Sequence, residues 1–204
     1  MLSAGTNVEW LCDDMNLIST PQESGEVAAS VSSTDGVTFV PALLGLGTPE
    51  WDYGARGTLS GITRGTTAPH VVRAVLDGIA QRGADLVDAA LADVSSRGID
   101  RPSRIRLDGG MSRNSTFVAM LADAIGTPIE VSEVTEATTL GAAYLSGVSA
   151  GVWPTLADAA ATWRCAAVLE SSMDGPERAA RRNSWRENLT MARAWIPALS
   201  ALDF

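Results

Sequence analysis

Apolar residues recur at intervals of three and four near the start of the chain, and this spacing predicts a helix over residues 5–18 that begins at Gly5. Its apolar stripe consists of Val8, Leu11, Met15 and Ile18. Residues 19–36 are mostly polar, so at most a short helix over 23–31 is expected there. Two short apolar segments, 37–40 and 57–62, predict strands because proline or glycine bounds each of them.

A long amphipathic helix is predicted after the second of these strands. Thr67 is a typical N-cap residue and Pro69 suits the first turn, so we expect the helix to begin there and to run to about Ser96. Its apolar face consists of Val72, Val75, Ile79, Leu86 and Val87. After it, residues 104–107 alternate between polar and apolar positions and predict a strand.

Helices and strands continue to alternate in the second half of the chain. A helix that ends at Gly126 is predicted to carry Phe117, Met120, Leu121 and Ile125, and a strand follows over 129–131. Residues 140–148 predict a helix whose small residues would pack closely on a sheet, namely Gly141, Ala142 and Ala143. From Thr155 onward we expect two further helices, the last of which opens near Pro176 and presents Trp185, Leu189, Ala192 and Ile196. This alternation predicts one α/β domain for the 204 residues.

The charge balance excludes several kinds of chemistry and disfavours two kinds of partner. All 15 basic residues are arginine, so a phosphate-binding lysine, a Schiff-base lysine and a lysine general base are excluded. The 24 acidic residues give a net charge of −9, opposite in sign to the basic surface of nucleic-acid-binding proteins. An anionic membrane surface is disfavoured for the same reason.

Few residues of the chain are suited to catalysis or to metal binding. The single histidine, His70, is expected to cap or pack at a helix start, and no serine or cysteine lies in a nucleophile elbow. Cys12 and Cys165 are too far apart for a zinc motif, and they are interpreted as buried residues in a reducing compartment, although a disulfide between them stays open. No signal peptide and no membrane span is indicated, so a cytoplasmic location is expected. Four aspartates are expected on solvated helix faces: Asp13, Asp14, Asp85 and Asp88.

The most informative stretch runs from Leu107 to Asn114 and leads from a strand through two glycines into a helix. Gly109 and Gly110 would let the backbone approach a flat or anionic ligand, and Asn114 could hydrogen-bond its edge. The simpler interpretation is a tight strand-to-helix turn in which Asn114 caps the helix. A dinucleotide-binding fingerprint is not present, because residues 45–50 supply only the first two of its three glycines.

Several motifs in order resemble the C-terminal half of the FGGY carbohydrate kinases, and most closely the members that phosphorylate glycerol. They are the stretches at 39–52, 55–57 and 61–65, a signature that spans 57–77, the double glycine with Asn114, and residues 139–145. The resemblance extends from Gly5 to about Trp153 and is weaker beyond. It implies an actin-like, ribonuclease-H-like ATPase domain, with a mixed sheet flanked by helices and without its first strands.

The resemblance also implies a cofactor and a set of contacts. The expected reaction transfers the γ-phosphoryl group of ATP, with Mg²⁺, to a hydroxyl of a polyol or sugar, glycerol being the expected acceptor. Gly5 matches a nucleotide-binding glycine of the family, and Glu9 replaces a glutamine, which adds repulsion toward phosphate unless Glu9 faces the adenine or ribose. The adenosine contacts carry over to Gly109, Gly110 and Asn114, with Met111 in the neighbouring position.

The parts of the kinase that act on the acceptor have no counterpart in residues 1–204. In the family the polyol pocket, the aspartate base, the metal ligands and the phosphate loops precede this region, so the chain is expected to be a C-terminal fragment that is inactive alone. An exposed sheet edge would then favour a homo-oligomer or swapped dimer. Three alternatives stay open: a kinase for another polyol or sugar such as xylulose, a non-catalytic actin-like nucleotide-binding module, and a purely structural domain.

Overall fold

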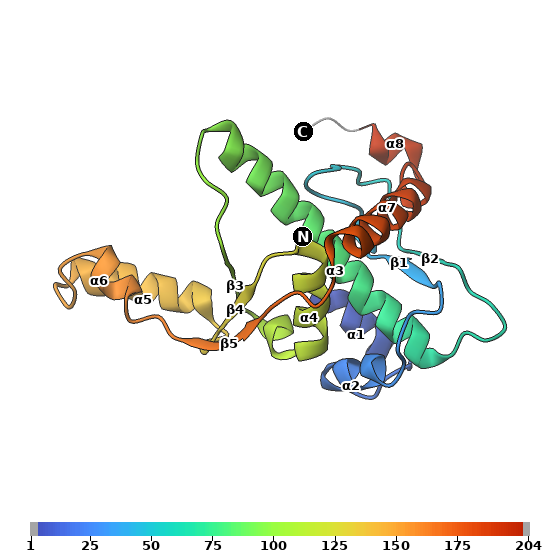
Figure 1. The fold of residues 1–204 in the computed structure, drawn as a ribbon, viewed down its shortest axis with the longest axis horizontal. Coiled ribbons are helices and arrows are strands. Elements are labelled where there is room, and N and C mark those ends of the chain that lie inside the picture. The colour runs from blue at the N-terminus through green and yellow to red at the C-terminus, as the bar shows by residue number, and fades with distance from the viewer. Residues whose placement is uncertain (1–3, 202–204) are drawn as a thin grey trace.

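The computed structural model describes residues 4–201 and is organised around one long helix, α3 (Ala68–Ser96) (Figure 1). Helices α1 (Gly5–Asp13), α2 (Ser24–Ala29) and α4 (Ser115–Ile125) pack against it, together with strand β1 (Thr38–Val40). The predicted start of α3 is confirmed. The side chain of Thr67 and that of His70 cap each other's backbone N–H groups, so the histidine has the capping role expected for it.

Two small sheets lie on different sides of α3. Strand β1 pairs antiparallel with β2 (Thr58–Ser60), with Thr38 opposite Ser60. The second sheet has the order β3-β4-β5, in which β3 (Ile105–Leu107) is parallel to β4 (Ile129–Ser132) and β5 (Cys165–Leu169) is antiparallel to it. The predicted α/β class with a mixed sheet is therefore confirmed.

A glycine in the middle of α3 lets the helix lie directly on the first sheet. A Cβ atom on Gly78 would come within 2.0 Å of the carbonyl oxygen of Phe39 in β1, so no side chain fits at this position. The residues around this contact, Phe39, Leu76 and Ile79, are at most 2% exposed. Burial of such apolar surface is the main force that holds α3 and β1 together.

The face of α3 that was expected to be solvated is instead covered by α7 (Gly175–Ala192), and Asp85 is only 8% exposed. Nη2 of Arg182 donates to Asp85 Oδ1 at 2.6 Å, and Nε1 of Trp185 donates to Asp85 Oδ2 at 2.9 Å. The expectation for Asp85 was wrong because nothing local in the sequence shows that a helix one hundred residues later returns to this face. Asp88 does lie exposed, as do Asp13 and Asp14.

A second buried arginine ties the loop after β1 to α3. Arg82, which is 2% exposed, forms ion pairs with Glu50 and with Asp85. Its Nη2 group donates to the backbone oxygens of Gly47 and Thr48 at 2.9 and 2.6 Å. Residues 47–50 are therefore held to α3 by charge-assisted hydrogen bonds.

Asp52 attaches the C-terminal segment to the same loop. Its carboxylate accepts hydrogen bonds from the hydroxyl of Ser200 at 2.6 Å and from the backbone N–H groups of Ala194 and Gly54 at 2.8 and 2.9 Å. Burial by itself raises the pKa of Asp52, but these hydrogen bonds favour the charged form and leave the pKa below its usual value. Helix α8 (Pro197–Ser200) is thereby fixed against the loop.

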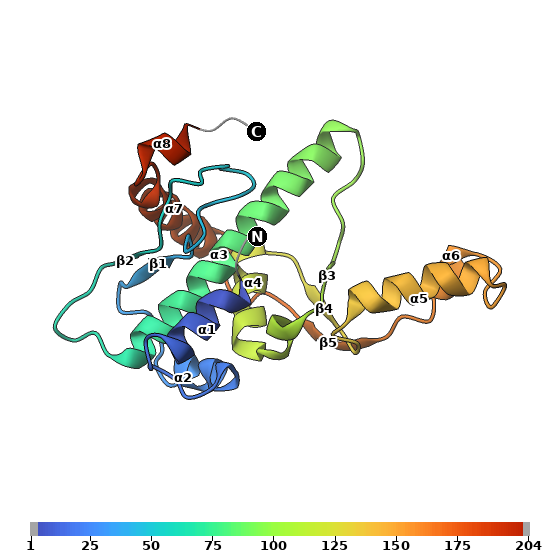
Figure 2. The same cartoon turned by 180° about the vertical axis from the view of Figure 1, so that it is seen from behind.

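Helix α5 (Ala137–Ser149) forms as predicted, but it does not pack on a sheet. It extends away from the body beside α6 (Leu156–Ala160), and none of its residues is buried (Figures 1 and 2). The glycine of α5 that a neighbouring group approaches closely is Gly147, where a Cβ would lie 2.3 Å from the ring of Trp153. The small residues 141–143 therefore serve no close packing within residues 4–201.

Other differences from the predicted elements are local. The first helix ends at Asp13 rather than at residue 18, which leaves Met15 exposed, although Ile18 is still buried after the turn. Strand β5 was not predicted, because its five residues were included in a helical tail. Both cysteines are free, and Cys165 is exposed rather than buried. Within the described part of the chain, no helix has both the length and the apolar character needed to cross a bilayer.

Substitution of Asp85 tests the buried ion pairs. Asp85→Asn keeps the shape of the side chain but leaves Arg182 and Arg82 with less compensating charge in a buried place, so we expect a loss of about 3 kcal/mol in the free energy of unfolding. Urea denaturation followed by circular dichroism measures it. Asp93→Asn, an exposed position on the same helix, is the control, and a change for Asp85→Asn as small as for Asp93→Asn would contradict the role assigned to Asp85.

Candidate functional site

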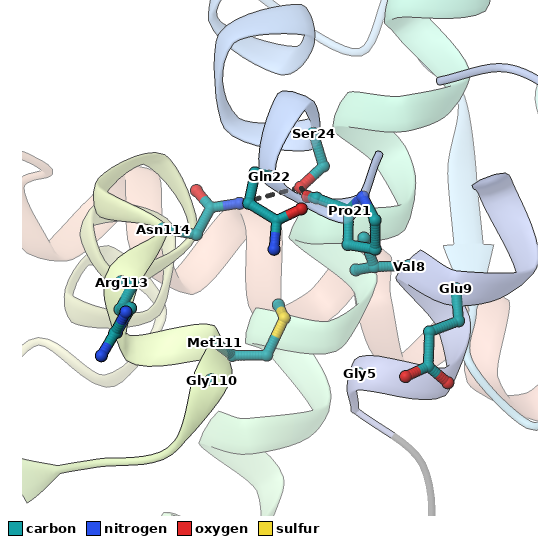
Figure 3. A pocket seen from close by; sticks show the side chains of 10 residues that line it. All are labelled: Gly5, Val8, Glu9, Pro21, Gln22, Ser24, Gly110, Met111, Arg113 and Asn114. Atoms are coloured by element: carbon teal, nitrogen blue, oxygen red, sulfur yellow. Dashed lines mark hydrogen bonds between the residues drawn. The ribbon is translucent and has the colours of Figure 1, made fainter. Parts of the chain in front are cut away.

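A cavity of about 310 Å³ lies between α1 and the turn that leads into α4 (Figure 3). Segments from three parts of the sequence form its wall. The lining residues are Gly5, Val8, Glu9, Pro21, Gln22, Ser24, Gly110, Met111, Arg113 and Asn114. Five of the six residues predicted from the sequence are therefore brought together here, while Gly109 is not among the lining residues.

The α1 wall of the cavity begins with a glycine. A Cβ atom on Gly5 would meet nothing within 4 Å, so the backbone at the start of α1 faces open space. Glu9 lies one turn later with an exposed carboxylate, and Val8 adds an apolar contact. The missing side chain at Gly5 leaves room for a flat group at the start of this helix.

The opposite wall is the double-glycine turn. Gly109 has a φ of +87°, which favours glycine, and its carbonyl oxygen accepts hydrogen bonds from the backbone N–H and the hydroxyl of Ser112 at 3.0 and 2.7 Å. The short helix η2 (Gly110–Arg113) then begins, and a Cβ on Gly110 would again meet nothing within 4 Å. Gly109 therefore makes the turn, and Gly110 leaves space in the cavity.

Asn114 fulfils the simpler of its two predicted roles and also lines the cavity. Its Oδ1 atom accepts a hydrogen bond from the backbone N–H of Phe117 at 3.0 Å, which caps α4. Its Nδ2 group donates to the hydroxyl of Ser24 at 3.0 Å and so joins α4 to α2. Gly25 permits this approach, because a Cβ there would lie 2.8 Å from Asn114 Oδ1. The side chain is thus held in one position at the cavity wall.

The segment that closes the cavity between its two walls was not predicted from the sequence. Pro21, Gln22 and Ser24 belong to η1 (Pro21–Glu23) and the start of α2, in a polar stretch without a motif. Arg113 was also missed, although it directly precedes Asn114. Its guanidinium donates to the hydroxyl of Thr135 at 3.2 Å and is the cationic group of the lining.

The chemistry available in the cavity favours binding rather than proton transfer. Its ionisable side chains are one carboxylate, Glu9, and one guanidinium, Arg113, on different walls. The volume lies at the lower end of the range for small-molecule sites. Among residues 4–201, no three His, Cys, Asp or Glu side chains are grouped so that they could hold a metal ion.

Comparison with known proteins gives consistent matches. Residues 1–150 match the C-terminal domain of the FGGY family of carbohydrate kinases. The glycerol kinase of Rhodopirellula baltica is 41% identical over 200 residues, which cover 98% of this chain and 36% of that protein. The structure of Plasmodium falciparum glycerol kinase with ADP has a TM-score of 0.81 and 36% identity, and covers 92% of this chain and 37% of that chain. A ligand-bound xylulose kinase from Lactobacillus acidophilus has a TM-score of 0.73 and 25% identity, with coverage of 97% and 39%.

The lengths of the matched proteins limit what the similarity covers. The chain spans a little more than a third of the length of the curated relative and of both solved structures. The match is therefore to one part of a larger kinase in each case. The similarity to these kinase structures, together with the mixed sheet, confirms the predicted actin-like ATPase fold.

The open space at Gly110 can be tested by filling it. We expect Gly110→Leu to leave the free energy of unfolding within about 0.5 kcal/mol, because a Cβ at this position meets no atom of the fold within 4 Å and the rest of the side chain can extend into the cavity. It should nevertheless prevent a ligand from entering the cavity. Binding of ADP by isothermal titration calorimetry measures this, with Gly141→Leu on the projecting α5 as control. ADP affinity equal in both variants would show that the cavity is not where ADP binds.

Proposed function

The chain belongs to the FGGY family of carbohydrate kinases, and on this premise we propose that it is the nucleotide-binding half of an ATP-dependent polyol kinase. The observation that carries the proposal is the cavity between α1 and the turn into α4. It collects Gly5, Glu9, Gly110, Met111 and Asn114, which motif resemblance alone had assigned to the nucleotide. The similar glycerol kinase of known structure contains ADP.

The two walls favour one orientation of the nucleotide. The side-chain-free surfaces of Gly5 and Gly110 leave room for the flat purine, and the thioether of Met111 can adapt to its face. Glu9 repels phosphate, so we place the ribose or the adenine edge beside it, where the carboxylate accepts hydrogen bonds. The guanidinium of Arg113 then lies on the side that tolerates phosphate. When bound, ATP supplies the γ-phosphoryl group.

The acceptor and the groups that activate it belong outside this chain in our proposal. The cavity lining contains no histidine or aspartate, and residues 4–201 contain no cluster of metal-ligating side chains. Phosphoryl transfer depends on positioning and on charge neutralisation around the γ-phosphate, so the polyol, Mg²⁺ and the base would be held by a further domain that closes on this one. We therefore propose that residues 1–204 are one domain of a larger enzyme.

Glycerol is the acceptor that we propose. Support comes from the relatives named glycerol kinase, at 41% sequence identity and at 36% identity in a solved structure, against 25% for the similar xylulose kinase. We also propose that the enzyme works in the cytoplasm, whose reducing conditions suit the two free cysteines. Phosphorylation of xylulose or of another polyol is the alternative within the same family.

Self-association is a further part of the proposal. Strands β3 and β5 form the two edges of the second sheet, and four of the five residues of β5 are exposed. Open edges of this kind can pair with another copy of the chain. We therefore propose that the chain forms a homo-oligomer, for which light scattering at several protein concentrations is the direct measurement.

Turnover by the larger enzyme tests the proposed activity. We expect ADP release with glycerol by the enzyme that contains this domain, and none by residues 1–204 alone. Turnover with xylulose only would show that xylulose, and not glycerol, is the acceptor. Binding of ATP without turnover of any polyol would overturn the kinase proposal in favour of a non-catalytic nucleotide-binding module.

A single substitution tests the orientation of the nucleotide. Glu9→Gln removes one negative charge from the cavity and keeps hydrogen-bonding capacity. Because the proposed orientation places the phosphates on the Arg113 side, away from Glu9, we expect the affinity for ATP to change by less than about threefold. Calorimetric titration with ATP and with adenosine separates the effect of Glu9 on the phosphates from its effect on the base and ribose, since adenosine carries no phosphate. A large gain in affinity for ATP without a gain for adenosine would show that phosphate lies beside Glu9, and would contradict the proposed orientation. Glu26→Gln, outside the lining residues, is the control.

A further inference from the structure

A second cavity, of about 250 Å³, lies where α7 passes α3 and the C-terminal end of α4. We call it the arginine pocket. Its lining residues are Asp88, Arg101, Ala124, Ile125, Gly175, Arg178, Ala179, Arg182, Asn183 and Arg186. Four of the 15 arginines of a chain with net charge −9 therefore gather around one hollow, together with a single carboxylate. It shares no lining residue with the proposed nucleotide cavity.

The carboxylate in the lining is already engaged by one of these arginines. Arg182, which is buried, donates to Asp88 Oδ2 at 3.0 Å and to Asp85 Oδ1 at 2.6 Å. The positive charge of Arg182 is thus neutralised within the fold. The remaining three arginines of the pocket have no such compensation: in the described part of the chain, no ion pair includes Arg101, Arg178 or Arg186.

Hydrogen bonds to neutral groups hold the other three guanidinium groups in place. Arg178 donates to the backbone oxygens of Asp123 and Met173, each at 2.6 Å, and to the hydroxyl of Ser171 at 2.9 Å. Arg101 donates to the hydroxyl of Thr127 at 3.1 Å. These contacts fix the positions of the guanidinium groups without neutralising their charge. They leave further N–H groups of each guanidinium available for a ligand.

Arg186 completes the set from the next turn of α7. Its Nη1 group donates to the side-chain oxygen of Asn183 at 3.0 Å, which is also neutral. The carboxylate of Asp123, whose backbone oxygen accepts from Arg178, accepts hydrogen bonds from the hydroxyl of Ser171 and the backbone N–H of Ser172 at 3.0 and 2.7 Å. Three like charges around one hollow repel each other, and a bound anion would relieve that repulsion.

We propose that the arginine pocket binds a phosphate group, either free inorganic phosphate or the phosphate of a small ester. Guanidinium groups present paired donors that match phosphate oxygens, and fixed guanidinium groups lose little freedom on binding. The volume is smaller than that of typical small-molecule pockets and fits a phosphate group with a short attachment rather than a nucleotide. The site is separate from nucleotide binding and does not depend on the proposed kinase activity.

Calorimetric titration of the full chain with inorganic phosphate and with glycerol 2-phosphate tests the proposal at constant ionic strength. The variant R101Q/R186Q removes two exposed arginines of the pocket, and we expect it to weaken binding of both probes, or of the one that binds, at least tenfold. The matched control R64Q/R97Q removes two exposed arginines elsewhere and should bind like the unmodified chain. Ala179→Glu, which places a carboxylate at an exposed lining position, should also abolish binding and serves if the double variant does not fold.

The probes also distinguish the two sources of phosphate. Tighter binding of glycerol 2-phosphate than of inorganic phosphate would identify a small ester as the ligand, and the reverse order would identify free phosphate. Equal loss of binding in R64Q/R97Q, or unchanged binding in R101Q/R186Q, would overturn the proposal. Binding of malonate as strong as that of phosphate would show that the pocket selects charge alone, and would overturn its assignment to phosphate.

Discussion

Packing of apolar side chains against α3 fixes the distance between α1 and α4, and the proposed nucleotide cavity is the space that remains between them. Val8 of α1 and Val118 of α4 belong to the same buried cluster as Val75 of α3. Loss of any one of these contacts would shift a cavity wall as well as reduce stability. The site is thus positioned by the core, while its own surface at Gly5 and Gly110 carries no side chain.

Charged groups attach the outer segments, which the apolar core does not hold. Arg82 holds the loop after β1, and Arg182 holds α7 through the same aspartate, Asp85. The charges of Arg82 and Arg182 are therefore neutralised by carboxylates of the fold. At Arg101, Arg178 and Arg186 the cations are held by neutral acceptors only. The contrast separates arginines that build the structure from arginines that are available to a ligand.

The sequence predicted most of the fold because local signals and tertiary packing agree over most of the chain. The cap at Thr67 and the glycine at 126 set helix ends correctly. The motifs predicted both main walls of the cavity, but not the segment at 21–24, which contributes through its position rather than through a motif. Burial of Asp85 and exposure of α5 depend on which distant segment covers a surface, and periodicity carries no information about that.

The central claim is that the cavity between α1 and the turn into α4 holds the nucleotide. A crystal structure of the chain grown with saturating ADP tests it most directly. We expect density for the adenosine between Gly5 and Gly110, with the ribose or the adenine edge beside Glu9. Ordered ADP on another face of the molecule, or an empty cavity at saturating ADP, would contradict it.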